Sequence, residues 1–256
     1  MDEINLIAIA IPIFFLLIGV EVLISRWMGR TGDYRFDDAV TDLSCGITSQ
    51  VTGLFAKGAL LALYTGLWAW GAVWDPPTWA AWVIAFVGID LMYYWWHRAS
   101  HRINFIWAAH IVHHHSEDYN LAVALRQAMF TKFSAYVFYL PLAILGIHPL
   151  IFAACDALNT LYQFWIHTRL VGKLGPLEWV MNTPSHHRVH HANNPKYLDA
   201  NYAGVFIIWD KMFGSFIPED RDEPCRYGLV RDLGTFNPLR VATHEWVGIA
   251  RDMWHA

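Results

Sequence analysis

The chain has 256 residues, of which 55% are apolar and only 16% are Asp, Glu, Lys or Arg, whereas a soluble protein carries about 25% of these charged residues. This composition excludes a disordered chain and indicates that much of the apolar surface faces a membrane. The formal charge of -4 offers no basic surface for a nucleic acid partner, and three cysteines without CxxC spacing argue against a disulfide framework or a thiolate metal site.

The first predicted element is a membrane helix over residues 4–25, in which Glu21 is the sole charge. A stretch of about 21 residues at 1.5 Å per residue spans about 31 Å, the thickness of a hydrocarbon core. Acidic residues precede this stretch, and Arg26 and Arg30 follow it. We therefore predict a retained helix rather than a cleaved signal peptide. The positive-inside rule places its C-terminal end in the cytoplasm.

Two further membrane helices are predicted over residues 47–74 and 78–97. Lys57 is the only charge in the former and Asp90 is the only acidic residue in the latter. The sequence Asp-Pro-Pro at residues 75–77 separates the two helices, because proline interrupts a helix.

The last predicted membrane element covers residues 133–167. Its first 23 residues carry no charge but contain Pro141 and Gly146, so a kinked span and a hairpin of two shorter helices are both open. These elements predict an all-α integral membrane protein with four to five membrane helices in a single domain. Because the spans return the chain to one side, the polar residues 98–132 and 170–256 are predicted to form a cytoplasmic cap.

Histidine is concentrated in two short windows, which hold ten of the fourteen histidines. Within them imidazoles recur three or four residues apart, a spacing that places side chains about 5–6 Å apart on one helix face and is typical of metal ligands. A metal such as zinc takes four ligands, so nine imidazoles predict two metal ions. The predicted ligands are His97, His101, His110, His113, His114, His167, His187, His190 and His191.

Three other residues are candidates near this site. Gln163 precedes His167 by four residues, and His186 lies within the third motif but off its spacing; for both, metal binding and an ordinary structural role are open. Asp90 lies two helical turns before His97 and is predicted to orient the imidazoles from behind. Imidazole binds Zn, Cu, Fe and Ni alike, so the spacing leaves the metal open, although oxidation of a C–H bond requires a redox metal such as iron.

The motifs HRASH at 97–101, HIVHH at 110–114 and HRVHH at 187–191 resemble the histidine boxes of the fatty acid hydroxylase and sterol desaturase superfamily of membrane di-iron oxygenases. The resemblance implies two Fe ions, dioxygen, a membrane lipid substrate and an electron donor, either a pterin or a redox protein. The positive-inside rule, applied to the first helix, places this active site on the cytoplasmic side. The oligomeric state is open.

Within the superfamily, segments 116–127 and 162–168 most resemble enzymes that cleave the ether bond of alkylglycerols by hydroxylation, with tetrahydrobiopterin as the reductant. Arg102 stands where those enzymes carry a glutamate, which leaves the donor open. A desaturase of the same superfamily is an alternative, because it uses the same metals. A histidine-rich metal transporter is another, but transporters place ionisable residues near the bilayer midplane, whereas these histidines follow helix ends.

Overall fold

The computed structural model describes residues 6–255, so the first two residues of the predicted helix 4–25 lie outside the described part. Within that part every named element is helical, and the one β-bridge joins Met181 and Phe206. The predicted all-α class is confirmed. The longer helices are α1 (Leu6–Trp27), α2 (Phe36–Gly71), α3 (Thr78–Arg102), α6 (Thr131–Ile144), α7 (Pro149–Trp165) and α10 (Pro238–His255). The shorter elements are η1 (Thr31–Asp33), α4 (Asn104–Trp107), α5 (Ile111–His114), η2 (Val123–Leu125), η3 (Gly175–Trp179), α8 (Pro184–His191) and α9 (Ile208–Met212).

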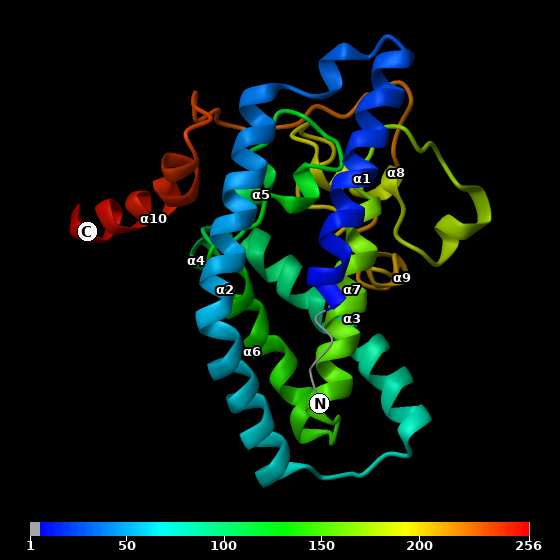
Figure 1. The fold of residues 1–256 in the computed structure, drawn as a ribbon, viewed down its shortest axis with the longest axis vertical. Coiled ribbons are helices and arrows are strands. Elements are labelled where there is room, and N and C mark those ends of the chain that lie inside the picture. The colour runs from blue at the N-terminus through cyan, green and yellow to red at the C-terminus, as the bar shows by residue number, and fades with distance from the viewer. Residues whose placement is uncertain (1–5, 256) are drawn as a thin grey trace.

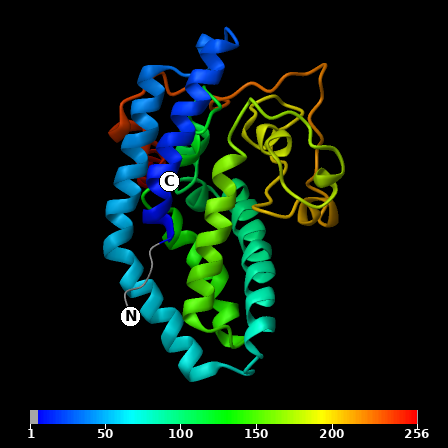
Figure 2. The ribbon, with the colours of Figure 1, turned by 45° about the vertical axis from the view of Figure 1, so that its right-hand side comes forward.

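Helices α1, α2, α3, α6 and α7 pack together in an elongated bundle (Figures 1 and 2). Helix α3 packs against α6 and α7, α2 packs against α6, and α1 packs against α7. Tyr64, Ile89, Trp96 and Phe152 are among the buried side chains at the centre of the bundle. The loops that carry α5 and α8 gather at one end of the bundle, and α10 projects sideways from it (Figure 1).

The opposite end of the bundle contains the connections between α2 and α3 and between α6 and α7. The backbone N–H of Val73 donates to the carbonyl of Ile144 across these connections. Gly146 has φ +102°, and a Cβ there would collide with the carbonyl of Trp74. The segment predicted over 133–167 is therefore a hairpin of two helices. With 14 and 17 residues, they measure about 21 and 25 Å, less than a hydrocarbon core.

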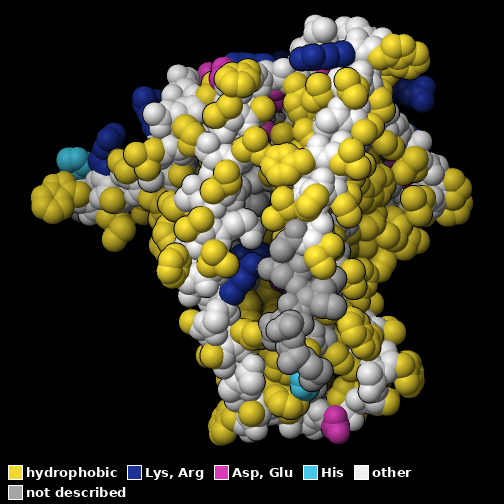
Figure 3. Space-filling model, in the orientation of Figure 1, with side chains coloured by type: hydrophobic (Ala, Val, Ile, Leu, Met, Phe, Trp, Pro, Cys, Tyr) yellow, Lys and Arg dark blue, Asp and Glu magenta, His cyan; other side chains and the backbone are white. Residues whose placement is uncertain are grey.

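Two helices of the described part, α1 and α2, are long and apolar enough to cross a membrane. Only 17% of the most apolar stretch of each is buried, so neither resembles the core helix of a soluble protein. Leu16, Leu23, Leu54 and Phe55 are among their exposed side chains. Hydrophobic side chains are spread along the whole length of this face, and most of its charged side chains lie toward the upper end (Figure 3). The larger number of spans remains a prediction.

Two elements differ from the sequence-based prediction. Helix α2 begins at Phe36 rather than at residue 47, because its acidic first turn favours a helix N-terminus and its buried Asp38 and Asp42 are paired with Arg126. Helix α10 lies within residues predicted only as part of the polar cap. Val241 is its one fully buried residue, and it packs in a small core with Ile111 and Val112.

Candidate metal centre

The nine predicted histidines lie in two groups at the end of the bundle. Within each group the ligand nitrogens all lie within 4.8 Å of one another. The first cluster consists of His97, His101, His110, His114 and His190. The second cluster consists of His113, His167, His187 and His191. The two clusters draw on the same short elements, since α5 and α8 each contribute to both.

The HxxHH spacing explains this division. Residues four apart on a helix share a face, whereas consecutive residues point about 100° apart. In α8, His187 and His191 therefore both face the second cluster, while His190 turns to the first. In the same way, the adjacent His113 and His114 separate into different clusters. A pair of consecutive histidines thus gives one ligand to each of two neighbouring sites.

Backbone carbonyls fix the protonation of four of these rings. A carbonyl oxygen can only accept a hydrogen bond, so the ring Nδ1 that contacts it carries the hydrogen and Nε2 keeps its lone pair. The four contacts join His97 to Tyr202 at 2.7 Å, His113 to Arg126 at 2.9 Å, His167 to Gln163 at 2.7 Å and His190 to Ala200 at 2.9 Å. In each case Nε2 is left free to bind a metal.

The free nitrogens face one another. In the second cluster, Nε2 of His167 lies 3.2 Å from Nε2 of His113, although Nδ1 carries the hydrogen on both rings. Two lone pairs at this distance repel each other unless a cation lies between them. Burial lowers the pKa of His113 to about 4 and that of His190 to about 3, so both rings are neutral at pH 7, the form that binds metals.

The donor set therefore fits metal ions. Two nitrogens bound to one ion at 2.0–2.1 Å lie at most about 4.2 Å apart, and the ligand nitrogens of each cluster lie within 4.8 Å of one another. All nine donors are imidazoles, which suit Zn, Cu, Fe and Ni. His101 adds a further observation, because its Nε2 is buried and makes no hydrogen bond to any described residue.

Asp90 supports the first cluster through a loop rather than by touching an imidazole. Its buried carboxylate accepts from the backbone N–H groups of Val205 and Phe206 at 2.7 and 2.9 Å. It also accepts from Asn159 and from the indole of Trp209, both at 2.8 Å. The sequence predicts that Asp90 orients the imidazoles from behind. In the structure its carboxylate instead binds the loop after residue 200.

This loop supplies the carbonyls that orient two ligands of the first cluster. Tyr202 and Ala203 donate their N–H groups to Asp210, each at 2.8 Å. The amide of Asn182 donates to the carbonyl of Ala203 at 2.7 Å. A Cβ at Gly204 would lie 2.8 Å from Oδ1 of Asp90, so only glycine permits this close approach.

Two candidate ligands lie outside both clusters. The side chain of Gln163 donates to Asn159 at 2.7 Å, and its contribution to the second cluster is the backbone carbonyl that holds His167. The ring of His186 packs edge-on against Phe216, and its Nδ1 is buried without a hydrogen bond to any described residue.

Two residues near the clusters are not among the predicted site residues. Asp199 lies 3.7 Å from Nδ1 of His101 and 3.7 Å from Nε of Arg102, so an acidic group accompanies the cation after the first motif. Its φ of 60° marks a tightly turned loop. Arg126 is fully buried. The sequence feature that could have identified it is its position as the only charged residue between Asp118 and Lys132.

An exposed apolar flank and two histidine clusters at one end of the helical bundle are the features expected of a membrane protein that binds metal ions. Residues 82–215 match the fatty acid hydroxylase family. The chain belongs to this family, and the membership predicted from the three histidine motifs is confirmed.

The chain is similar to three proteins described as alkylglycerol monooxygenase. It is 45% identical to that of Xenopus tropicalis over 94% of this chain and 54% of the relative. It is 44% identical to that of Homo sapiens over 96% and 55%, and 46% identical to that of Danio rerio over 89% and 51%. The chain thus spans about half the length of these relatives. No solved structure matches it.

Proposed function

We propose that the chain is a di-iron oxygenase of the membrane that hydroxylates a long-chain lipid. The observation that carries this proposal is the division of nine imidazoles, eight of them buried and that of His101 partly buried, into two clusters in which free Nε2 atoms converge. Iron in these clusters would supply the redox chemistry that activates dioxygen, which zinc lacks. The family match and the names of the relatives support an oxygenase over a metal transporter.

The residues of the chain have three tasks in this proposal. The imidazoles hold two irons, and the carbonyls of Tyr202, Ala200, Arg126 and Gln163 orient four of them. Burial of both clusters excludes water, so the reaction proceeds away from competing solvent. The electrons come from an external donor, a pterin such as tetrahydrobiopterin or a redox protein.

The proposed substrate is a lipid already dissolved in the bilayer. The exposed apolar flanks of α1 and α2 face the bilayer in this arrangement, and the clusters lie at the end of the same bundle. The relatives' printed name favours an alkylglycerol, whose ether bond breaks after hydroxylation of the adjacent carbon. That hydroxylation produces a hemiacetal, which separates into an aldehyde and an alcohol.

Lipid products measured by mass spectrometry test this function. Purified iron-loaded protein would receive an alkylglycerol or a fatty acid ester lipid, with dioxygen and either tetrahydrobiopterin or a ferredoxin system. We expect oxidation of the alkylglycerol with release of an aldehyde. Loss of two hydrogens without gain of oxygen would identify a desaturase instead. Failure of every donor to support oxidation of any lipid, together with metal uptake by protein-containing vesicles, would identify a transporter.

A further inference from the structure

One face of α2 carries three residues spaced four apart, Asp38, Asp42 and Gly46. This spacing places them in a row along the helix, at the end of α2 that lies beside the metal centre (Figure 1). All three contact the same segment, residues 123–126, which comprises η2 and Arg126. We refer to these three residues as the α2 docking face.

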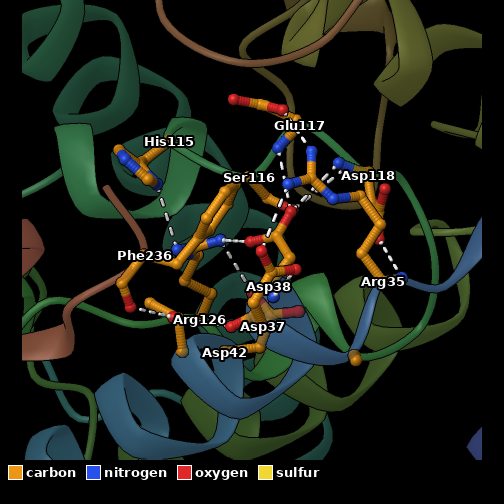
Figure 4. Close-up of polar contacts among 12 residues, drawn as sticks. Arg35, Asp37, Asp38, Asp42, His115, Ser116, Glu117, Asp118, Arg126 and Phe236 are labelled. Carbon is orange, nitrogen blue, oxygen red and sulfur yellow. Dashed lines mark hydrogen bonds and ion pairs between the residues drawn. The ribbon is translucent and has the colours of Figure 1, made fainter. Parts of the chain in front are cut away.

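Arg126 is the ionic partner of the docking face. Its guanidinium is 0% exposed and pairs with Asp38 and, at 3.0 Å, with Asp42. Figure 4 shows the two carboxylates reaching this guanidinium, which also contacts Nδ1 of His115 at 3.1 Å. Loss of one member of a buried ion pair leaves an uncompensated charge, so this contact fixes the position of Arg126 relative to α2.

Gly46 provides a second contact to the same segment, against its backbone. A Cβ at this position would lie 2.5 Å from the carbonyl oxygen of Leu125, closer than side chains and backbone can approach. Helix α2 therefore rests directly on the backbone one residue before Arg126. By contrast, Gly58 and Gly66 on the same helix have open space at the Cβ position.

The segment held in this way reaches the second cluster through its backbone. The carbonyl of Arg126 accepts from Nδ1 of His113 at 2.9 Å. On the opposite edge of that ring, Nε2 of His113 lies 3.2 Å from Nε2 of His167. The first cluster has different supports, because His97 and His190 bond to carbonyls of the loop at 200–202.

We propose that the α2 docking face and Arg126 position His113 and thereby set the metal affinity of the second cluster alone. The inference rests on the proposed metal centre. Arg126 is a positioning residue, since it acts through an imidazole and touches no reacting atom. Residues behind a ligating imidazole typically change metal affinity by about 10- to 100-fold when mutated.

Cobalt(II) titration of the purified full chain tests the proposal, with bound metal followed by visible absorption and elemental analysis. The wild-type chain should bind two ions. Gly46→Ala should bind one of them about 10- to 100-fold more weakly, and Gly58→Ala should bind both as the wild type does. When His114→Ala has disabled the first cluster, adding Gly46→Ala should lower the affinity for the one ion that still binds. When His113→Ala has disabled the second cluster, adding Gly46→Ala should leave the affinity for the remaining ion unchanged.

A double variant guards against misfolding of Gly46→Ala. Arg126→Gln with Asp42→Asn removes the guanidinium and one carboxylate together, while Asp38 keeps hydrogen bonds from Ser116 and the N–H of Glu117. It should show the same selective weakening, with wild-type helix content by circular dichroism. Arg169→Gln, which breaks an ion pair with Asp33, is the control and should bind both ions normally.

If these variants bound both ions equally more weakly, the positioning role would be overturned. It would also be overturned if they bound two ions with wild-type affinity. Fewer than two ions in the wild-type chain would instead show that the proposed metal centre is wrong. The wild-type titration therefore separates failure of the proposed function from failure of this inference.

Discussion

Three consecutive histidines in α5 and just after it lie in three different environments. His113 belongs to the second cluster and His114 to the first, whereas His115 accepts from Arg126 through Nδ1. We expect two irons in the wild-type chain, and loss of a different one in His113→Ala and in His114→Ala. His115→Ala is the matched control and should retain both. Elemental analysis with Mössbauer spectra of each variant measures this; loss of iron in the His115 variant alone would contradict the assignment.

Asp90 is the residue on which the loop of the first cluster depends. The N–H of Val205 and the indole of Trp209 donate to different oxygens of this carboxylate, so the NH2 group of an amide in its place would face one of these donors in either orientation. Because an unpaired buried donor costs about 1–3 kcal/mol, we expect Asp90→Asn to lower the unfolding midpoint and to weaken metal binding in the first cluster. Thermal unfolding and iron content would be compared with exposed Asp75→Asn; identical behaviour of the two variants would refute this role.

At the scale of helices, the histidine motifs predicted the nine imidazoles that gather at this site, but not how the two clusters divide them, because each cluster joins side chains from several elements. The sequence does not reveal which backbone carbonyl meets an Nδ1 atom, since Tyr202 and Arg126 reach His97 and His113 through tertiary packing. Gln163 illustrates the same point: the side chain was the candidate, but the backbone carbonyl makes the contact. The hairpin was one of two predicted alternatives, and its break lies at Gly146 rather than at Pro141, which stays inside α6.

Gly146 determines how the two helices of this hairpin meet the connection between α2 and α3. Its φ of +102° is a conformation that side chains avoid, and a Cβ would displace the carbonyl of Trp74. We expect Gly146→Ala to lower stability by about 1–3 kcal/mol without changing the iron content of the folded fraction. Thermal unfolding in detergent checks this. Gly66→Ala is the control, because a Cβ at Gly66 would meet no other atom within 4 Å. An unchanged midpoint, or selective loss of iron, would contradict it.

For the whole molecule, the two ends of the bundle are chemically different. One end carries the connections near Trp74 and Gly146, and the other carries the histidine clusters and the polar loops (Figures 1 and 2). Arg26 lies in the last turn of α1, and Arg30 follows this helix at the latter end. Because cytoplasmic loops are enriched in Lys and Arg, we propose that the metal centre faces the cytoplasm and the connection at residues 72–77 faces the opposite side.

Cysteine labelling of intact cells tests this orientation. Asp75 and Arg221 are exposed residues at the two ends, and Cys225, the one native cysteine that is not fully buried, would first be changed to Ser. A maleimide that cannot cross the membrane should label Asp75→Cys in intact cells and should label Arg221→Cys only after the cells are opened. The native Cys45 and Cys155 are buried and give the background. Labelling of Arg221→Cys but not Asp75→Cys in intact cells would reverse the topology and place the metal centre outside the cytoplasm.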